Sequence, residues 1–229
     1  MTHMNPQPEL VLFDLDDTLC DYGGARVGRL RIAFELAQET SGRSFTSPID
    51  DLVSESIRIQ PHGVDHFPTL LSDHGIDDPA AALAATQWYV SNRFHGLQLF
   101  PDAIETLNFI RSSEPNRRLG MVTNGPADVQ SAKIDLLDLR PYFDFCLISG
   151  AFGVWKPDRA IFLEALSLGR TAPQQAVMIG DSAEHDIEGA RATGIPTIWM
   201  NRHDLSWPQE ISPPSFVACN LGDVRQLLG

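Results

Sequence analysis

The sequence contains no apolar run that approaches the roughly 18 residues needed to cross a lipid bilayer. The segment from Met1 to Glu9 is polar and lacks both the basic stretch and the apolar stretch of a secretory signal. We therefore expect a soluble protein that stays in the cytoplasm and has no membrane partner.

Basic residues are scarce. The chain contains 17 Lys and Arg and 30 Asp and Glu, which gives a formal net charge of −13. A field of this sign repels nucleic acids and anionic membranes. We therefore expect no nucleic-acid polymer among the partners. Lysine is rarer still, since Lys133 and Lys156 are the only two in the chain. A lysine in a chemically suggestive context therefore stands out.

Cysteine is also sparse. The three cysteines, Cys20, Cys146 and Cys219, are widely separated and have apolar neighbours. An odd number at irregular spacing is not the pattern of a disulfide framework or of a zinc site. The pattern predicts buried thiols in a reducing compartment.

Short apolar runs alternate with helical patterns over most of the chain. The expected strands are 10–13, 119–122, 145–148, 176–179, 195–200 and a short one from 216. Asp102 and Asp158 are expected to cap two of the intervening helices. Strands that alternate with helices predict an α/β fold with a Rossmann-like, doubly wound parallel sheet.

One segment interrupts this alternation directly after the first strand. Apolar residues recur in it at helical spacing, as in Val27, Leu30, Phe34 and Ala37. Further helices are expected around 52–57, 67–74 and 80–94, and nothing in the segment resembles a strand. We therefore expect a core domain of residues 1–19 and 98–229 with an inserted helical cap domain of residues 20–97.

Polar groups end or follow four of the expected strands. They are Asp14 with Asp16, Thr123 with Asn124, Lys156, and Asp181 with Asp186. Parallel strands bring their carboxyl ends to one edge of a sheet, where ligands bind in α/β folds. The set offers a nucleophile, a proton shuttle, oxygen ligands for a hard metal and groups for phosphate oxygens. Each residue alone would be read as a turn, a cap or a solvated side chain, but the ordered set indicates metal-dependent phosphoryl chemistry.

The same segments resemble the haloacid dehalogenase superfamily, in the subfamily I branch with a helical cap after the first strand. The matching segments are Asp14-Leu15-Asp16-Asp17-Thr18, Val122-Thr123-Asn124-Gly125, Lys156-Pro157-Asp158 and Gly180-Asp181-Ser182 through Asp186. These core motifs look most like those of pyrimidine 5'-nucleotidases and N-acylneuraminate-phosphate phosphatases. The resemblance covers the core motifs, and the cap carries no signature of a substrate.

The resemblance implies a role for each acid. Asp14 attacks phosphorus, and Asp16 protonates the leaving alkoxide and then activates the water that hydrolyses the aspartyl phosphate. Mg²⁺ is the expected cofactor, held by the Asp14 carboxylate, the Asp16 backbone carbonyl and Asp181. Asp186 is expected to position Lys156 or a metal-bound water without binding the metal directly.

The remaining motif residues are expected to contact the substrate phosphate. Lys156 neutralises charge on the phosphoryl group, while Thr123, Asn124 and nearby backbone N–H groups hold its oxygens. The predicted substrate is a small phosphorylated metabolite, either a nucleoside monophosphate or a sugar phosphate. The expected assembly is a monomer or a homodimer.

The predicted activity is therefore Mg²⁺-dependent hydrolysis of a phosphate monoester. Dehalogenases of the superfamily attack carbon and lack the second acid, so Asp16 favours attack on phosphorus. A sugar-phosphate mutase of the same fold is an alternative. An alternative of another class is a catalytically silent phosphoryl-binding or signalling protein. The early position of Asp14 and the long helical insertion disfavour a signalling receiver domain. The intact set of Asp14, Asp16, Thr123, Lys156 and Asp181 disfavours a silent family member.

Overall fold

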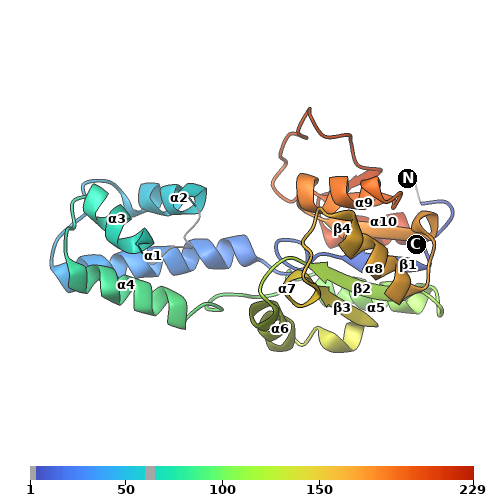
Figure 1. Cartoon of the computed structure of the whole chain (residues 1–229), viewed down its shortest axis with the longest axis horizontal. Coiled ribbons are helices and arrows are strands. Elements are labelled where there is room, and N and C mark those ends of the chain that lie inside the picture. The colour runs from blue at the N-terminus through green and yellow to red at the C-terminus, as the bar shows by residue number, and fades with distance from the viewer. Residues whose placement is uncertain (1–3, 60–64) are drawn as a thin grey trace. The chain divides into compact units, whose positions relative to one another are not determined.

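The computed structural model describes residues 4–59 and 65–229. The chain divides into two units, Met1–Asp21 with Leu99–Gly229 and, between them in the sequence, Tyr22–Gln98 (Figure 1). We call them the sheet unit and the helical unit. The sequence places the limits of the expected cap at residues 20 and 97, and the role of the helical unit as a cap stays a prediction.

The sheet unit is built on six parallel strands in the order β3-β2-β1-β4-β5-β6. Their bounds are β1 Leu10–Phe13, β2 Arg118–Thr123, β3 Phe145–Ile148, β4 Ala176–Gly180, β5 Thr197–Met200 and β6 Phe216–Ala218. The chain winds outward from β1 in both directions, so the strand order reverses between β1 and β4. Such a switch point opens a crevice at the carboxyl ends of the strands. The predicted doubly wound parallel sheet is confirmed.

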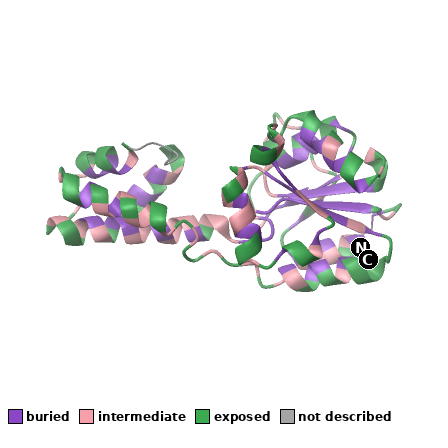
Figure 2. Cartoon of the chain, turned by 60° about the horizontal axis from the view of Figure 1, so that its bottom comes forward, coloured by how far each residue is buried: buried purple, intermediate pink, exposed green. Residues whose placement is uncertain are grey.

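Helices connect the strands of the sheet unit. They are α5 Ala103–Ser113, α6 Ala127–Leu136, α7 Ser149–Phe152, α8 Arg159–Gly169, a π-helical turn Ala183–Glu188, α9 Gly189–Ala192 and α10 Leu221–Leu228, with 3₁₀ turns at Arg140–Tyr142 and Pro173–Gln175. Leu10 and Leu12 pack with Ile161 and Phe162 of α8. Side chains alternate along a strand, so the residues between them point to the opposite face. Buried residues accordingly run along the strands (Figure 2).

The helical unit contains four helices and no strand among its described residues. They are α1 Tyr22–Ser41, α2 Ile49–Ile59, α3 His66–Asp73 and α4 Pro79–Ser91. Its core is apolar, with the ring centroid of Phe34 6.0 Å from that of Phe45 and 5.7 Å from that of Phe67. The helices lie where the apolar spacing predicts them, because that spacing gives each helix one buried face.

The two expected helix caps have different outcomes in the structure. Asp158 caps α8, with its carboxylate accepting from the backbone N–H of Ala160 at 2.8 Å. Asp102 makes no such bond to α5 and instead accepts from the backbone N–H of Leu221 at 2.8 Å. Asp102 therefore stands at the N-cap position of α5, as predicted, but its side chain does not cap the helix because it binds a distant segment.

The cysteines are free, but only Cys20 is buried. Cys146 is half-buried and Cys219 is exposed, so the prediction of three buried thiols is wrong for Cys219. Cys219 lies between β6 and α10, where its backbone N–H binds the Asp223 carboxylate. Within residues 4–59 and 65–229, no helix has the length and apolarity to cross a membrane.

Candidate active site

Asp14 directly follows β1 at the switch point of the sheet. Its backbone N–H donates to the carbonyl of Ile179 at 2.9 Å, which fixes it beside β4, and its side chain is buried. The chain then turns sharply through Asp17, whose φ of 57° lies in the left-handed region that Asp tolerates better than most residues. Asp16, between Asp14 and this turn, lines the same hollow as Asp14.

Lys156 lies at the centre of the site and is buried. Its Nζ donates to Asp14 Oδ1 and to Asp186 Oδ1, each at 2.6 Å. Asn124 holds the backbone of Lys156 on both sides, because its Oδ1 accepts from the Lys156 N–H and its Nδ2 donates to the Lys156 carbonyl, each at 2.9 Å. The Asn124 side chain is thus committed to Lys156, so a phosphate contact from this residue would use its backbone N–H.

Asp186 reaches Lys156 from the π-helical turn that follows β4. Its second oxygen, Oδ2, accepts from the backbone N–H of Ser182 at 3.0 Å. Gly180 leaves room for this carboxylate, since a Cβ at position 180 would collide with it. The widened turn and the glycine together place a charged group at the end of β4, and π-helical turns are frequent at functional sites.

The site concentrates negative charge. One carboxylate oxygen from each of Asp14, Asp181 and Asp186 lies within 4.8 Å of the others. Burial, only partly offset by the Lys156 charge, raises the pKa of Asp14 to about 7. Burial and the charge of Asp186 raise the pKa of Asp181 to about 8. Burial alone would lower the pKa of Lys156, but Asp14 and Asp186 outweigh it and raise that pKa. An all-oxygen cluster short of positive charge fits a hard divalent cation.

Asp16 has different partners. Its carboxylate accepts from Lys133 Nζ at 2.8 and 2.7 Å and from Gln130 Nε2 at 3.1 Å. Gln130 also donates to Thr123 Oγ1 at 2.6 Å. Sequence reasoning missed Gln130 and Lys133 as site residues. The available signal was that Lys133 is one of only two lysines and stands one helical turn after a glutamine.

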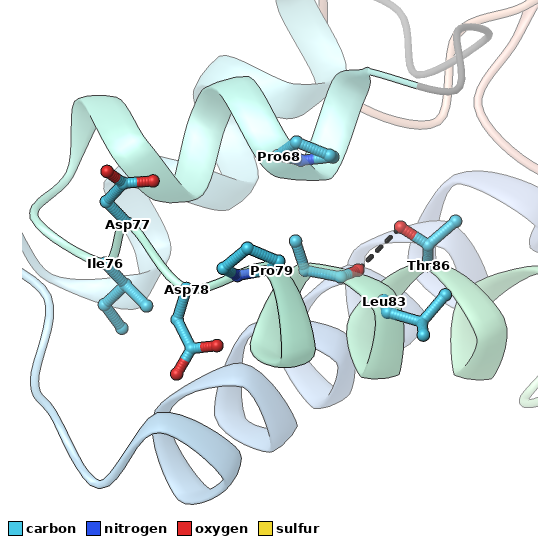
Figure 3. A pocket seen from close by; sticks show the side chains of 8 residues that line it. Pro68, Ile76, Asp77, Asp78, Pro79, Leu83 and Thr86 are labelled. Atoms are coloured by element: carbon cyan, nitrogen blue, oxygen red, sulfur yellow. Dashed lines mark hydrogen bonds between the residues drawn. The ribbon is translucent and has the colours of Figure 1, made fainter.

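A hollow of about 150 Å³ lies over these groups. The structure brings every predicted site residue to its walls, namely Asp14, Asp16, Thr123, Asn124, Lys156, Asp181 and Asp186. A larger hollow of about 440 Å³ lies in the helical unit between α3 and α4 (Figure 3). Its lining is mostly apolar, and it contains none of the predicted site residues. The volume of a hollow therefore does not identify the candidate site, whereas the convergence of charged side chains does.

A comparison with known proteins identifies the family of this chain. The haloacid dehalogenase-like hydrolase family matches residues 8–194. This chain belongs to that family. The match includes the whole helical unit. In the sheet unit it ends at residue 194, shortly after Asp181 and Asp186.

Two characterised relatives and one solved structure illustrate the likeness. The pyrimidine 5'-nucleotidase YjjG of Escherichia coli (strain K12) is 37% identical over 129 residues, which are 56% of this chain and 56% of that relative. The glyceraldehyde 3-phosphate phosphatase of Methanopyrus kandleri is 35% identical over 199 residues, 84% of this chain and 83% of that relative. The HAD-hydrolase YfnB of Bacillus subtilis, solved with bound magnesium, has a TM-score of 0.75 at 22% identity and covers 97% of this chain and 99% of that one. This last likeness is one of fold.

Proposed function

We propose that this family member hydrolyses phosphate monoesters of small metabolites through an aspartyl-phosphate intermediate, with Mg²⁺ as its cofactor. The observation that carries the proposal is the buried Asp14 carboxylate, 2.6 Å from Lys156 Nζ, in a hollow shared with Asp181 and Asp186. A nucleophile, a cation and further acids converge at the edge of the sheet where ligands bind.

The carboxylate cluster suits Mg²⁺, which prefers oxygen ligands and keeps several waters. Asp14, Asp181 and the backbone carbonyl of Asp16 are the proposed ligands. When bound, the ion would offset the negative charges of the attacking carboxylate and of the phosphoryl group. Both oxygens of Asp186 already accept from Lys156 and Ser182, which supports a positioning role for Asp186 instead of direct ligation.

In the first step, Asp14 Oδ attacks phosphorus while the bond to the leaving oxygen breaks. Asp16 gives its proton to that oxygen. The Lys156 ammonium and the Thr123 hydroxyl stabilise the phosphoryl oxygens, since preorganised donors act strongly in a partly buried site. The products are an alcohol and a phosphorylated Asp14.

In the second step, the Asp16 carboxylate takes a proton from water as the water oxygen bonds to phosphorus. The bond between phosphorus and Asp14 breaks, and inorganic phosphate leaves. Asp16 ends the cycle protonated and Asp14 ends it ionised, so the cycle restores both groups.

The substrate class is proposed from the relatives. Pyrimidine nucleoside monophosphates and triose or sugar phosphates are the compounds to test first, because named relatives act on a pyrimidine 5'-nucleotide and on glyceraldehyde 3-phosphate. Asp16 lines the hollow, and this second acid favours hydrolysis of phosphate esters over dehalogenation. Cytoplasmic location and a monomeric or homodimeric state stay predictions from the sequence.

A screen of phosphate monoesters tests the proposal. Wild type and Asp14→Asn are compared with and without Mg²⁺, and both free phosphate and isomerised substrate are measured. We expect phosphate release that requires Mg²⁺ and disappears in Asp14→Asn. Full activity of the variant, or full activity in excess chelator, would contradict the mechanism. Isomerisation of a sugar phosphate without phosphate release would favour a mutase.

A further inference from the structure

Helix α6 presents two buried polar side chains to the site. Gln130 and Lys133 are 1% and 4% exposed and stand one turn apart, so they project from the same face of the helix. Buried amide and ammonium groups are stable only when they are hydrogen-bonded. Both find the same partner, Asp16.

The three contacts hold the Asp16 carboxylate in one orientation. Lys133 Nζ lies 2.8 Å from Oδ1 and 2.7 Å from Oδ2, and Gln130 Nε2 lies 3.1 Å from Oδ2. The Asp16 side chain is still 23% exposed and lines the hollow. The Asp16 carboxylate is therefore held by side chains of α6 on one side and is exposed to the hollow on the other.

Gln130 links this carboxylate to the phosphate-binding hydroxyl. Its Nε2 also donates to Thr123 Oγ1 at 2.6 Å. A hydroxyl has a single hydrogen, so Thr123, which accepts from Gln130, keeps that hydrogen for an acceptor elsewhere, such as a phosphate oxygen. Gly125, with a φ of +150°, makes room for the glutamine, because a Cβ there would lie 2.7 Å from Gln130 Cγ.

We propose that Gln130 and Lys133 are positioning residues for proton transfer by Asp16. The inference rests on the proposed hydrolase function. The two side chains keep the Asp16 carboxyl in line with the leaving oxygen in the first step and with the attacking water in the second.

The test uses two substrates of similar size that differ in their need for a proton. The phenolate of phenyl phosphate is a poor leaving group that requires protonation, whereas p-nitrophenolate leaves unprotonated. We expect Lys133→Met and Gln130→Met to lower kcat/KM for phenyl phosphate by about a hundredfold, within the range that general acid catalysis contributes, and for p-nitrophenyl phosphate by less than about tenfold. Asp16→Asn should show the same selectivity with a larger loss.

A matched control separates positioning from packing. Ile134→Val changes the buried face of the same helix and removes no polar contact. It should lower kcat/KM for both substrates by the same small factor. Equal losses on both substrates in Lys133→Met and Gln130→Met would overturn the proposal. If Lys133→Met does not fold, Gln130→Met alone decides.

A second measurement does not depend on activity. Addition of Mg²⁺ should raise the Tm of Lys133→Met and Gln130→Met as much as that of wild type, and should not raise that of Asp181→Asn. A lost Mg²⁺ response in the α6 variants would show that these residues act through the metal site and would overturn the proposal. Wild type without hydrolysis of either ester would instead contradict the proposed function itself.

Discussion

The sheet unit and the helical unit bury different kinds of side chain. The buried residues of the helical unit are apolar except for Arg29 and Ser56, among the residues that the structure describes. The sheet unit buries Asp14, Lys156 and Asp186 together under one hollow. Buried charges need close partners and carry a desolvation penalty that apolar packing does not. The helical unit thus buries almost only apolar side chains, whereas one edge of the sheet unit also buries charged ones.

The largest expected effect separates activity from stability within the sheet unit. Asp14→Asn removes the nucleophile but keeps its shape, so we expect kcat/KM to fall by about 10⁴-fold or more. The Tm should stay close to that of wild type, because Asn keeps the shape of the side chain and Lys156 keeps its contact with Asp186. Steady-state kinetics and thermal unfolding measure the two effects. A large loss of Tm with activity retained would contradict the role of Asp14 as the nucleophile.

The converse is expected in the helical unit. Phe34→Ala removes a ring that packs against Phe45 and Phe67, so we expect a loss of about 4 kcal/mol in the free energy of unfolding. Well below the transition temperature, kcat/KM for p-nitrophenyl phosphate should stay within about a factor of three, because the lost contacts belong to the core of the helical unit and not to the residues that line the hollow. Urea unfolding and kinetics measure this. Phe34→Leu is the control and should lose less stability.

A buried ion pair in the sheet unit should give a somewhat smaller loss of stability. Lys156→Met leaves Asp14 and Asp186 facing each other without a cation, and we expect about 3 kcal/mol less stability near pH 8 in the absence of Mg²⁺. The double variant Lys156→Met/Asp186→Asn should recover part of that loss. Equal free energies of unfolding in urea for wild type and Lys156→Met would show that Lys156 does not stabilise the two carboxylates.

The smallest effect is a pH dependence of stability. The pKa values of Asp14 and Asp181 are raised from 3.8 to about 7 and about 8, so the folded state binds more protons than the unfolded state. The contribution of both groups is therefore full below the unfolded pKa of 3.8, falls as the pH rises above it, and is lost once the pH passes the folded values of about 7 and about 8. Without Mg²⁺, the Tm should fall by several degrees over this window, at about 2–4 °C per kcal/mol. Mg²⁺ should reduce the fall, and Asp181→Asn should flatten it. A Tm that rises with pH would contradict the charge cluster.

Much of the fold and the central acids could be predicted from the sequence. Apolar runs and helical spacing are local signals, and Asp14, Asp16 and Asp181 follow strand ends closely in the sequence. Contacts between distant segments leave no such signal. Asp102 looks like a cap but binds Leu221, across more than a hundred residues.

The partners of Asp16 were missed for the same reason. Gln130 and Lys133 stand on an expected helix, where a polar residue is usually solvated. Their burial follows from the way α6 packs over the turn after β1, a tertiary arrangement that spacing does not encode. The π-helical turn that brings Asp186 to Lys156 was missed likewise, since a helical pattern does not reveal one extra residue in a turn.

The central claim is that Asp14 carries the phosphoryl group during turnover. Acid quenching of the enzyme in the presence of Mg²⁺ and a hydrolysed phosphate ester, followed by peptide mass spectrometry, tests it directly. We predict phosphate on the peptide that contains Asp14, and none on this peptide from Asp14→Asn. Turnover with no phosphorylated peptide in wild type, or phosphate on another residue, would contradict the account.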